Sequence, residues 1–325
     1  MHMNTAKFMN TWGRRLLRQR IIALMAMAMV APSISTHAQT ATDLQLILEI
    51  GKTALQVGEP VYATVRLVNK GSVPVNVHST LFPQGEAVQI EIMETTGHRS
   101  IFQPLAEAFH VAPMRELTPG SQLSASFPIF YGGKGWTVTR RPGTYALRAI
   151  YVEPRSKFVE ITRSDAVTVT VSEFDGAGQF LMEGKAGSQA GKFLLWQGGD
   201  HLKEGITRLT DLIAQFPQSV LSDYASMILG RSLAREFKDY SRDKLRAPQC
   251  DEALLYLKKA RAENLPLYLK ISRAVEQVRC LVRLGQKDEA ADWVNEAKRL
   301  IDNQQKWEFF LAHLKGLESE PVRTP

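Results

Sequence analysis

The sequence has few cysteines and no unusual composition. Only two of its 325 residues are cysteine, Cys250 and Cys280, which excludes a disulfide-dense miniprotein. Hydrophobic residues make up 44% and charged residues 22%, which excludes a disordered or collagen-like chain. At about 150 residues per domain, the length indicates two domains.

The common catalytic and phosphate-binding motifs are also missing. The sequence contains no GxSxG, no HExxH and no GxxxxGK[ST]. Glu107 and His110 have a spacing that could ligate a metal, but the sequence shows no second cluster of ligands. The histidines after residue 38 are scattered: His78, His98, His110, His201 and His313. We therefore expect no enzyme activity, no metal and no cofactor.

The positive charge is concentrated at the N-terminus. The formal net charge is +7, and residues 1–38 hold five Lys and Arg with no Asp or Glu. Residues 39–184 carry 12 basic and 14 acidic residues, and residues 185–325 carry 23 and 19. Without the leader the charge is near zero, so nucleic-acid binding is not predicted.

The first 38 residues have the pattern of a signal peptide. A basic leader is followed by an eleven-residue apolar run, Ile21 to Ala31, and by small residues before Ala38. An apolar run of this length is too short to span a bilayer, which needs about 20 residues. We predict cleavage after Ala38 and a periplasmic or secreted protein with no membrane span in its mature chain. The alternative is an uncleaved membrane anchor.

Residues 42–172 alternate between apolar and polar positions, which predicts an antiparallel β-sandwich. The apolar positions of four expected strands each fall on one face: Val61, Ala63, Val65 and Leu67; Val73, Val75 and Val77; Val88, Ile90 and Ile92; and Val167, Val169 and Val171. Ala146, Ala149 and Tyr151 belong to a further expected strand. Turn residues such as Asn69–Ser72 and Pro142–Gly143 separate these runs.

The segments VGEPVYATVRLVNKG and PGTYALRAIY resemble the bacterial immunoglobulin-like family of sandwich modules. The resemblance implies that Tyr145 lies at a corner where its hydroxyl binds the backbone. This half contains no cysteine, so the inter-sheet disulfide of antibody domains is excluded.

A glycine-rich stretch, 173–186, is expected to be a linker, and residues 187–318 show helical periodicity. The pattern Asp-Glu-Ala-x-x-aromatic-aliphatic-x-x-Ala begins at Asp251 and recurs at Asp288. This half therefore resembles the tetratricopeptide repeat family. The expected helix pairs are 187–198 with 202–215, 219–237 with 250–263, and 268–284 with 287–301, and a last helix near 304–317 would cap the stack. The fold class is thus multidomain, all-β followed by all-α.

The repeat resemblance implies that the first helix of each pair lines a concave surface. Its register places four arginines there: Arg231, Arg235, Arg279 and Arg283. Four guanidiniums could bind a carboxylate-rich peptide or an acidic polymer. The leading interpretation is therefore a non-catalytic adaptor that holds a protein or peptide partner. Alternatively, the arginines form a solvated basic face or ion pairs with Glu236 and Glu276.

A second interpretation assigns binding to the sandwich. Tyr131 and Trp136 flank the loop Gly132–Gly135, and exposed aromatic rings can bind sugars or a protein partner. The sandwich would then be a carbohydrate-binding, hydrolase-associated or inhibitory module. The alternative is that these rings pack onto the sandwich.

The two cysteines are predicted to meet. The turn around Asn264–Pro266 is equidistant from Cys250 and Cys280, so antiparallel helices bring the two residues level. An exported compartment permits a disulfide between them. The alternative is a pair of buried thiols.

Overall fold

The computed structural model describes residues 43–106, 113–153, 159–239 and 243–302. The described residues belong to one compact unit. The predicted signal peptide, the Glu107–His110 pair and the capping helix near 304–317 lie outside the described residues.

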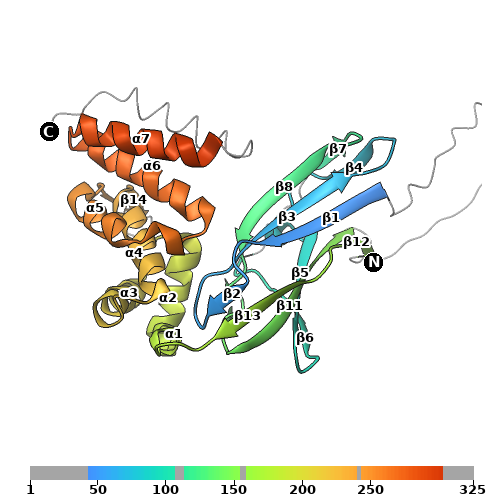
Figure 1. Cartoon of the computed structure of the whole chain (residues 1–325), viewed down its shortest axis with the longest axis horizontal. Helices are drawn as coiled ribbons and strands as arrows, with labels where there is room; N and C mark the ends of the chain where they lie inside the picture. The colour runs from blue at the N-terminus through green and yellow to red at the C-terminus, as the bar shows by residue number, and fades with distance from the viewer. Residues whose placement is uncertain (1–42, 107–112, 154–158, 240–242, 303–325) are drawn as a thin grey trace, which may run out of the picture. The chain divides into compact units, whose positions relative to one another are not determined.

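The N-terminal half is rich in antiparallel β-structure, as predicted, and has two main sheets (Figure 1). One has the strand order β1-β3-β8, with β1 at Leu44–Ile50, β3 at Tyr62–Asn69 and β8 at Gln122–Pro128. The other has the order β2-β13-β11-β5-β6: Ala54–Gln56, Val167–Ser172, Gly143–Glu153, Val88–Glu94 and Arg99–Ile101, with β12 (Val159–Arg163) paired to β11. Two small pairs are β4–β7 (Val75–His78 with Met114–Leu117) and β9–β10 (Tyr131–Gly132 with Gly135–Trp136). The pairing of β2 with β13 is parallel, which the antiparallel prediction did not include.

Most of the alternating apolar positions form the core between the sheets, whereas Val73 is 46% exposed. Val61, Ala63, Val65 and Leu67 are buried together with Val88, Ile90 and Ile92 in one cluster that includes residues of both sheets. In β11 the buried face is formed by Tyr145, Leu147 and Ala149, whereas the expected Ala146 points the other way. The β11 sequence is apolar on both faces, so alternation alone did not fix its orientation.

The tyrosine corner is confirmed. The Tyr145 hydroxyl donates a hydrogen bond of 2.9 Å to the carbonyl oxygen of Arg141, four residues upstream. This bond ties the start of β11 to the turn that precedes it. The assignment to the immunoglobulin-like family remains a prediction.

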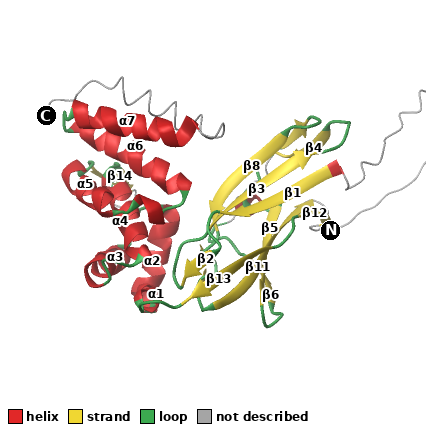
Figure 2. Cartoon of the chain, viewed as in Figure 1, coloured by secondary structure: helices red, strands yellow, loops and turns green. Residues whose placement is uncertain are grey.

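The C-terminal half is helical, as predicted (Figure 2). Its helices are α1 (Ala177–Met182), α2 (Gly184–Trp196), α3 (Lys203–Gln215), α4 (Val220–Leu233), α5 (Cys250–Lys259), α6 (Leu267–Arg283) and α7 (Lys287–Asp302). Helices α2 to α7 match the three expected pairs. The insertion between α4 and α5 contains the short hairpin β14–β15 (Phe237–Asp239 with Lys244–Arg246). Membership of the tetratricopeptide family remains a prediction.

The stretch expected to be a linker contains a helix, α1, which packs closely against the sheet-rich half. Residues 177–182 form α1, and a Cβ atom at Gly178 would lie 2.1 Å from the carbonyl oxygen of Val57. A Cβ at Gly191 of α2 would lie 2.3 Å from the ring of Tyr131. These glycines are present because the helices approach the strands too closely for any side chain, so glycine content did not indicate flexibility here.

Polar contacts also join the helices to the strands. Tyr131 and Ser188 of α2 share a hydrogen bond of 2.8 Å between their hydroxyls. The Glu59 side chain is fully buried and accepts bonds from the Lys52 ammonium at 2.8 Å and the Gln56 amide at 2.9 Å. It also bonds to the hydroxyl of Tyr224 on α4. No described helix is both long and apolar enough to cross a membrane.

Burial of Glu59 makes folding stability depend on pH. Burial raises the pKa of this carboxyl above 4.5, although Lys52 and the Gln56 amide oppose the shift. The folded protein therefore holds a proton that the unfolded chain loses, and stability falls as pH rises through the raised pKa. We expect the stability of the wild type relative to Glu59→Gln to increase as pH falls from neutral toward 4.5. Urea unfolding of both proteins across this range measures the effect, and a difference independent of pH contradicts it.

Candidate functional site

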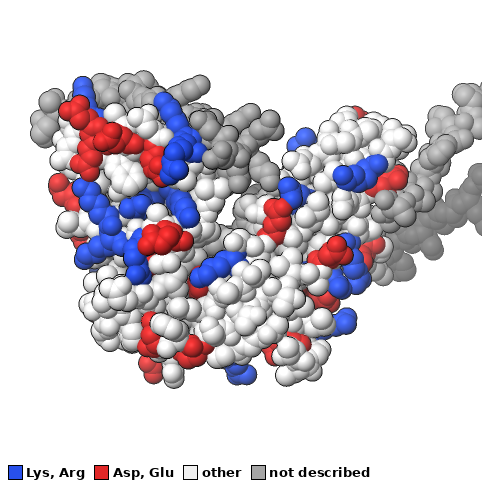
Figure 3. All heavy atoms as spheres, in the orientation of Figure 1, with Lys and Arg blue, Asp and Glu red and all other residues white. Residues whose placement is uncertain are grey.

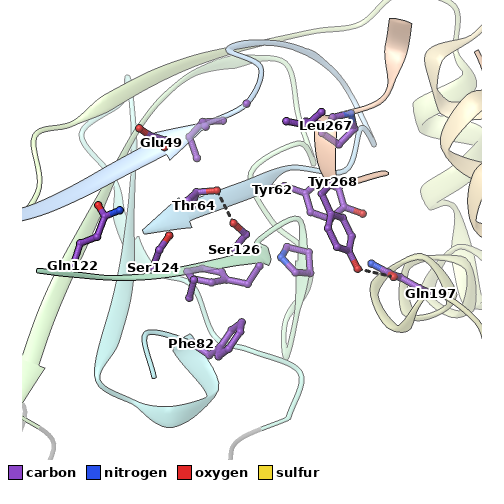
Figure 4. Close-up of a pocket in the computed structure, with 16 residues that line it drawn as sticks. Glu49, Tyr62, Thr64, Phe82, Gln122, Ser124, Ser126, Gln197, Leu267 and Tyr268 are labelled. Atoms are coloured by element: carbon purple, nitrogen blue, oxygen red, sulfur yellow. Dashed lines mark hydrogen bonds between the residues drawn. The ribbon is translucent and has the colours of Figure 1, made fainter. Parts of the chain in front are cut away.

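One cavity lies between the sheet β1-β3-β8 and the helices. It has a volume of about 740 Å³ and is lined by strand residues together with Gln197 and with residues 266–268 at the start of α6. We call it the sheet–helix groove (Figure 4). Tyr62, Thr64, Ser124 and Ser126 line it from the outward face of the sheet, and the buried residues Ala125 and Phe127 of β8 also border it.

The floor of the groove consists of neutral polar side chains. The hydroxyls of Thr64 and Ser126, on the paired strands β3 and β8, share a hydrogen bond of 2.7 Å. Ser124 and Gln122 continue this line along β8, where both are exposed. Among the described lining residues, Glu49 alone carries a formal charge, and it pairs with the guanidinium of Arg66.

Two tyrosines form one wall of the groove. The rings of Tyr62 on β3 and Tyr268 on α6 lie 6.3 Å apart between centroids. The Tyr268 hydroxyl donates to the Gln197 side-chain oxygen at 3.3 Å and accepts from the Arg231 guanidinium at 3.2 Å. Burial raises the pKa of Tyr62, so its hydroxyl stays neutral. The wall therefore combines two aromatic rings with the hydrogen-bonded hydroxyl of Tyr268.

The local backbone explains how these residues reach the groove. Gln197 follows α2 in a left-handed conformation with φ of 59°, and Gly198 and Gly199 continue this turn. Pro266 precedes α6 as its N-cap, so Tyr268 lies in the first helical turn. A further aromatic pair, Phe82 and Phe127, has ring centroids 6.1 Å apart, and Phe82 is exposed within the groove.

The structure brings the predicted arginines into contact with the chain's own groups. Arg235, which follows the end of α4, donates to the Glu276 carboxylate on α6 at 2.7 Å, and Arg279 lies 3.3 Å from its other oxygen. The Glu276 side chain is fully buried. Two of the four predicted arginines thus form an ion-pair cluster with Glu276, as one of the alternatives from the sequence had it.

The other two predicted arginines have different surroundings. Arg231 donates to Tyr268 and to the Ser272 hydroxyl at 2.9 Å, so it orients the groove wall. Arg283 is exposed at the end of α6. On the face drawn in Figure 3, basic and acidic side chains are interspersed over the helices.

The prediction of an exposed aromatic loop is wrong. Tyr131 and Trp136 are 3% and 8% exposed, and their rings meet edge to face with centroids 5.6 Å apart. They pair across the β9–β10 hairpin, and Tyr131 packs against α2. Sequence identified the rings but not the helix that covers them. The groove aromatics Tyr62 and Tyr268 were missed for the same reason, since nothing in sequence shows that α6 faces the sheet.

The two cysteines meet as predicted, but they are free and buried thiols. Cys250 begins α5, Cys280 lies in the last turn of α6, and their thiols share a hydrogen bond. The predicted disulfide is therefore not present in the structure. The described residues contain no cluster of three or more His, Cys, Asp or Glu side chains that could hold a metal ion.

Comparisons with known proteins do not assign a family. No family model and no curated protein matches this chain. Solved structures with partial similarity include a β-glucosidase from Listeria innocua, at 14% identity and a TM-score of 0.25, covering 40% of this chain and 16% of that one. This chain thus spans only a small part of that enzyme.

Two further solved structures show similar partial matches. The CARDB domain of a Pyrococcus furiosus protein, solved with di-metal ions, has 16% identity and a TM-score of 0.23, covering 40% of this chain and 88% of that domain. An alkylpurine DNA glycosylase from Pseudomonas fluorescens, solved with DNA, has 14% identity and a TM-score of 0.24, covering 40% of this chain and 30% of that one. These similarities are to part of the chain only and name no function for it.

Proposed function

We propose that this chain is an exported, non-catalytic binding protein whose sheet–helix groove holds an extended segment of a partner protein. The observation that carries the proposal is the groove itself, with its line of neutral polar side chains between aromatic rings. The order of basic, apolar and small residues in 1–38 supports export.

The chemistry of the lining favours a polypeptide segment. Hydroxyls and amides at Thr64, Gln122, Ser124 and Ser126 can donate to and accept from a peptide backbone without a charge on the ligand. The aromatic rings at Tyr62, Phe82 and Tyr268 provide apolar surfaces for its side chains. The arginines that would attract an acidic ligand are already engaged, because Arg235 and Arg279 pair with Glu276.

The proposal can be tested with a displayed library of random peptides. Peptides selected on the wild-type protein should lose affinity about tenfold or more for Ser126→Arg, because the added side chain fills the groove. Tyr268→Ala should have a similar effect by removing one wall. Affinity is measured by fluorescence anisotropy of the labelled peptide.

The control is an equivalent change on the other sheet. Thr168 is an exposed residue of β13 outside the groove, so Thr168→Arg should retain wild-type affinity. Equal affinity of all variants overturns the proposal. Glycan binding that Ser126→Arg abolishes, in a protein that selects no peptide, overturns it in favour of a carbohydrate ligand.

A further inference from the structure

The thiol pair at Cys250 and Cys280 has a role in neither the groove nor the ion-pair cluster. The two residues come from different helices, α5 and α6, and their thiols are in hydrogen-bond contact. Both are buried with Ala253, Leu254 and Leu281 in a small apolar cluster. Because separate helices hold the two thiols in contact, a disulfide bond between them would need little movement of the chain.

The two thiols are not equivalent. Cys250 is 7% exposed, whereas Cys280 is fully buried. Cys250 is also the first residue of α5, a ten-residue helix, and free backbone amides at a helix N-terminus favour a thiolate. Arg283, exposed at the end of α6, adds positive charge nearby.

We propose that Cys250 and Cys280 form a reversible dithiol–disulfide modification site, in which Cys250 attacks a low-molecular-weight disulfide and Cys280 resolves the product. The small exposed fraction of Cys250 favours a small reagent over a protein oxidant.

The acidity of the two groups is consistent with this division of roles. The hydrogen bond from Cys280, followed by the charges of Arg283 and Arg279, lowers the pKa of Cys250, although burial and Asp251 oppose the shift. The same hydrogen bond and burial raise the pKa of Cys280. The pair thus loses its first proton from Cys250 and keeps its second on Cys280.

The reaction is a two-step thiol–disulfide exchange. The Cys250 thiolate attacks one sulfur of the external disulfide, so a mixed disulfide forms and the other half leaves as a thiolate. The Cys280 thiol then loses its proton to solvent and attacks the sulfur of Cys250, which releases the second half as a thiolate. The two cysteines are oxidised by two electrons, and the external disulfide is reduced to two thiols.

Mass spectrometry after treatment with oxidised glutathione tests the assignment. The folded wild type should lose two hydrogens and form the internal disulfide. Cys280→Ser should instead accumulate glutathione on Cys250, because no resolving thiol remains. Cys250→Ser should react at least about tenfold more slowly, since its remaining thiol is buried and less acidic.

The wild type supplies a second readout that needs no variant. Limiting iodoacetamide should alkylate Cys250 before Cys280, as peptide mapping would show. Two free thiols in folded wild type after prolonged exposure to oxidised glutathione would overturn the proposal. It is equally overturned if Cys280 is alkylated first or if Cys250→Ser reacts as fast as Cys280→Ser.

Discussion

Replacing Gly178 with alanine is expected to lower the free energy of unfolding by about 2 kcal/mol. The new Cβ would lie 2.1 Å from the carbonyl oxygen of Val57 and 2.7 Å from its carbonyl carbon. These are backbone atoms, so no side-chain rotation relieves the clash. The short helix α1 cannot move away without exposing Ala177 and Leu181, which are both buried.

The sign of this change distinguishes close packing from a flexible connection. Alanine in a helix is normally more stable than glycine by about 1 kcal/mol. A loosely held linker would therefore be stabilised by the substitution, whereas the close contact predicts a net loss. Gly51→Ala is the control, because no atom lies within 4 Å of the added Cβ. Denaturant unfolding measures the free energy of unfolding of both variants. A Gly178→Ala protein as stable as the wild type refutes the prediction.

Replacing Glu276 with alanine is expected to cost about 3 kcal/mol of stability. The fully buried carboxylate joins Arg235, just after α4, to Arg279 of α6, and the Arg279 side chain is only 14% exposed. Without Glu276, Arg279 would lose the carboxylate that lies 3.3 Å from it, while its charge would stay poorly solvated. Arg235 adds less to the cost because its side chain is 38% exposed.

Glu296→Ala is the matched control for Glu276→Ala. Glu296 also pairs with an arginine, Arg299, but both side chains are substantially exposed on α7. Exposed pairs of this kind contribute little, so we expect no measurable change in the denaturation midpoint. Equal effects of the two substitutions would show that the Glu276 cluster does not stabilise the packing of α4 against α6.

The cluster also bears on the charge that the predicted arginines present. Sequence register placed Arg235 and Arg279 on one surface, and the structure does bring them together. Because they meet at a carboxylate of the same chain, one of their two positive charges is compensated within the chain. The groove offers neutral hydrogen-bonding groups instead, which is why the proposed ligand is a polypeptide segment and not an acidic polymer.

The sequence alone determined the elements and much of the core. Alternation in β3 identified Val61, Ala63, Val65 and Leu67 as buried, and helical periodicity located α2 to α7. The corner at Tyr145 was also predictable, because its hydrogen bond reaches only four residues along the chain. These features depend on local spacing, which a single sequence contains.

Only the tertiary structure decided what the outward-facing residues contact. The sequence placed Tyr62 and Thr64 on the polar face of a strand, but it did not show that Tyr268 of α6 lies against that face. The same limit applies to Gly178, Trp136 and Glu276, whose roles depend on neighbours far along the chain. Contacts between elements depend on how they pack in three dimensions, and periodicity along one element carries no information about its partner.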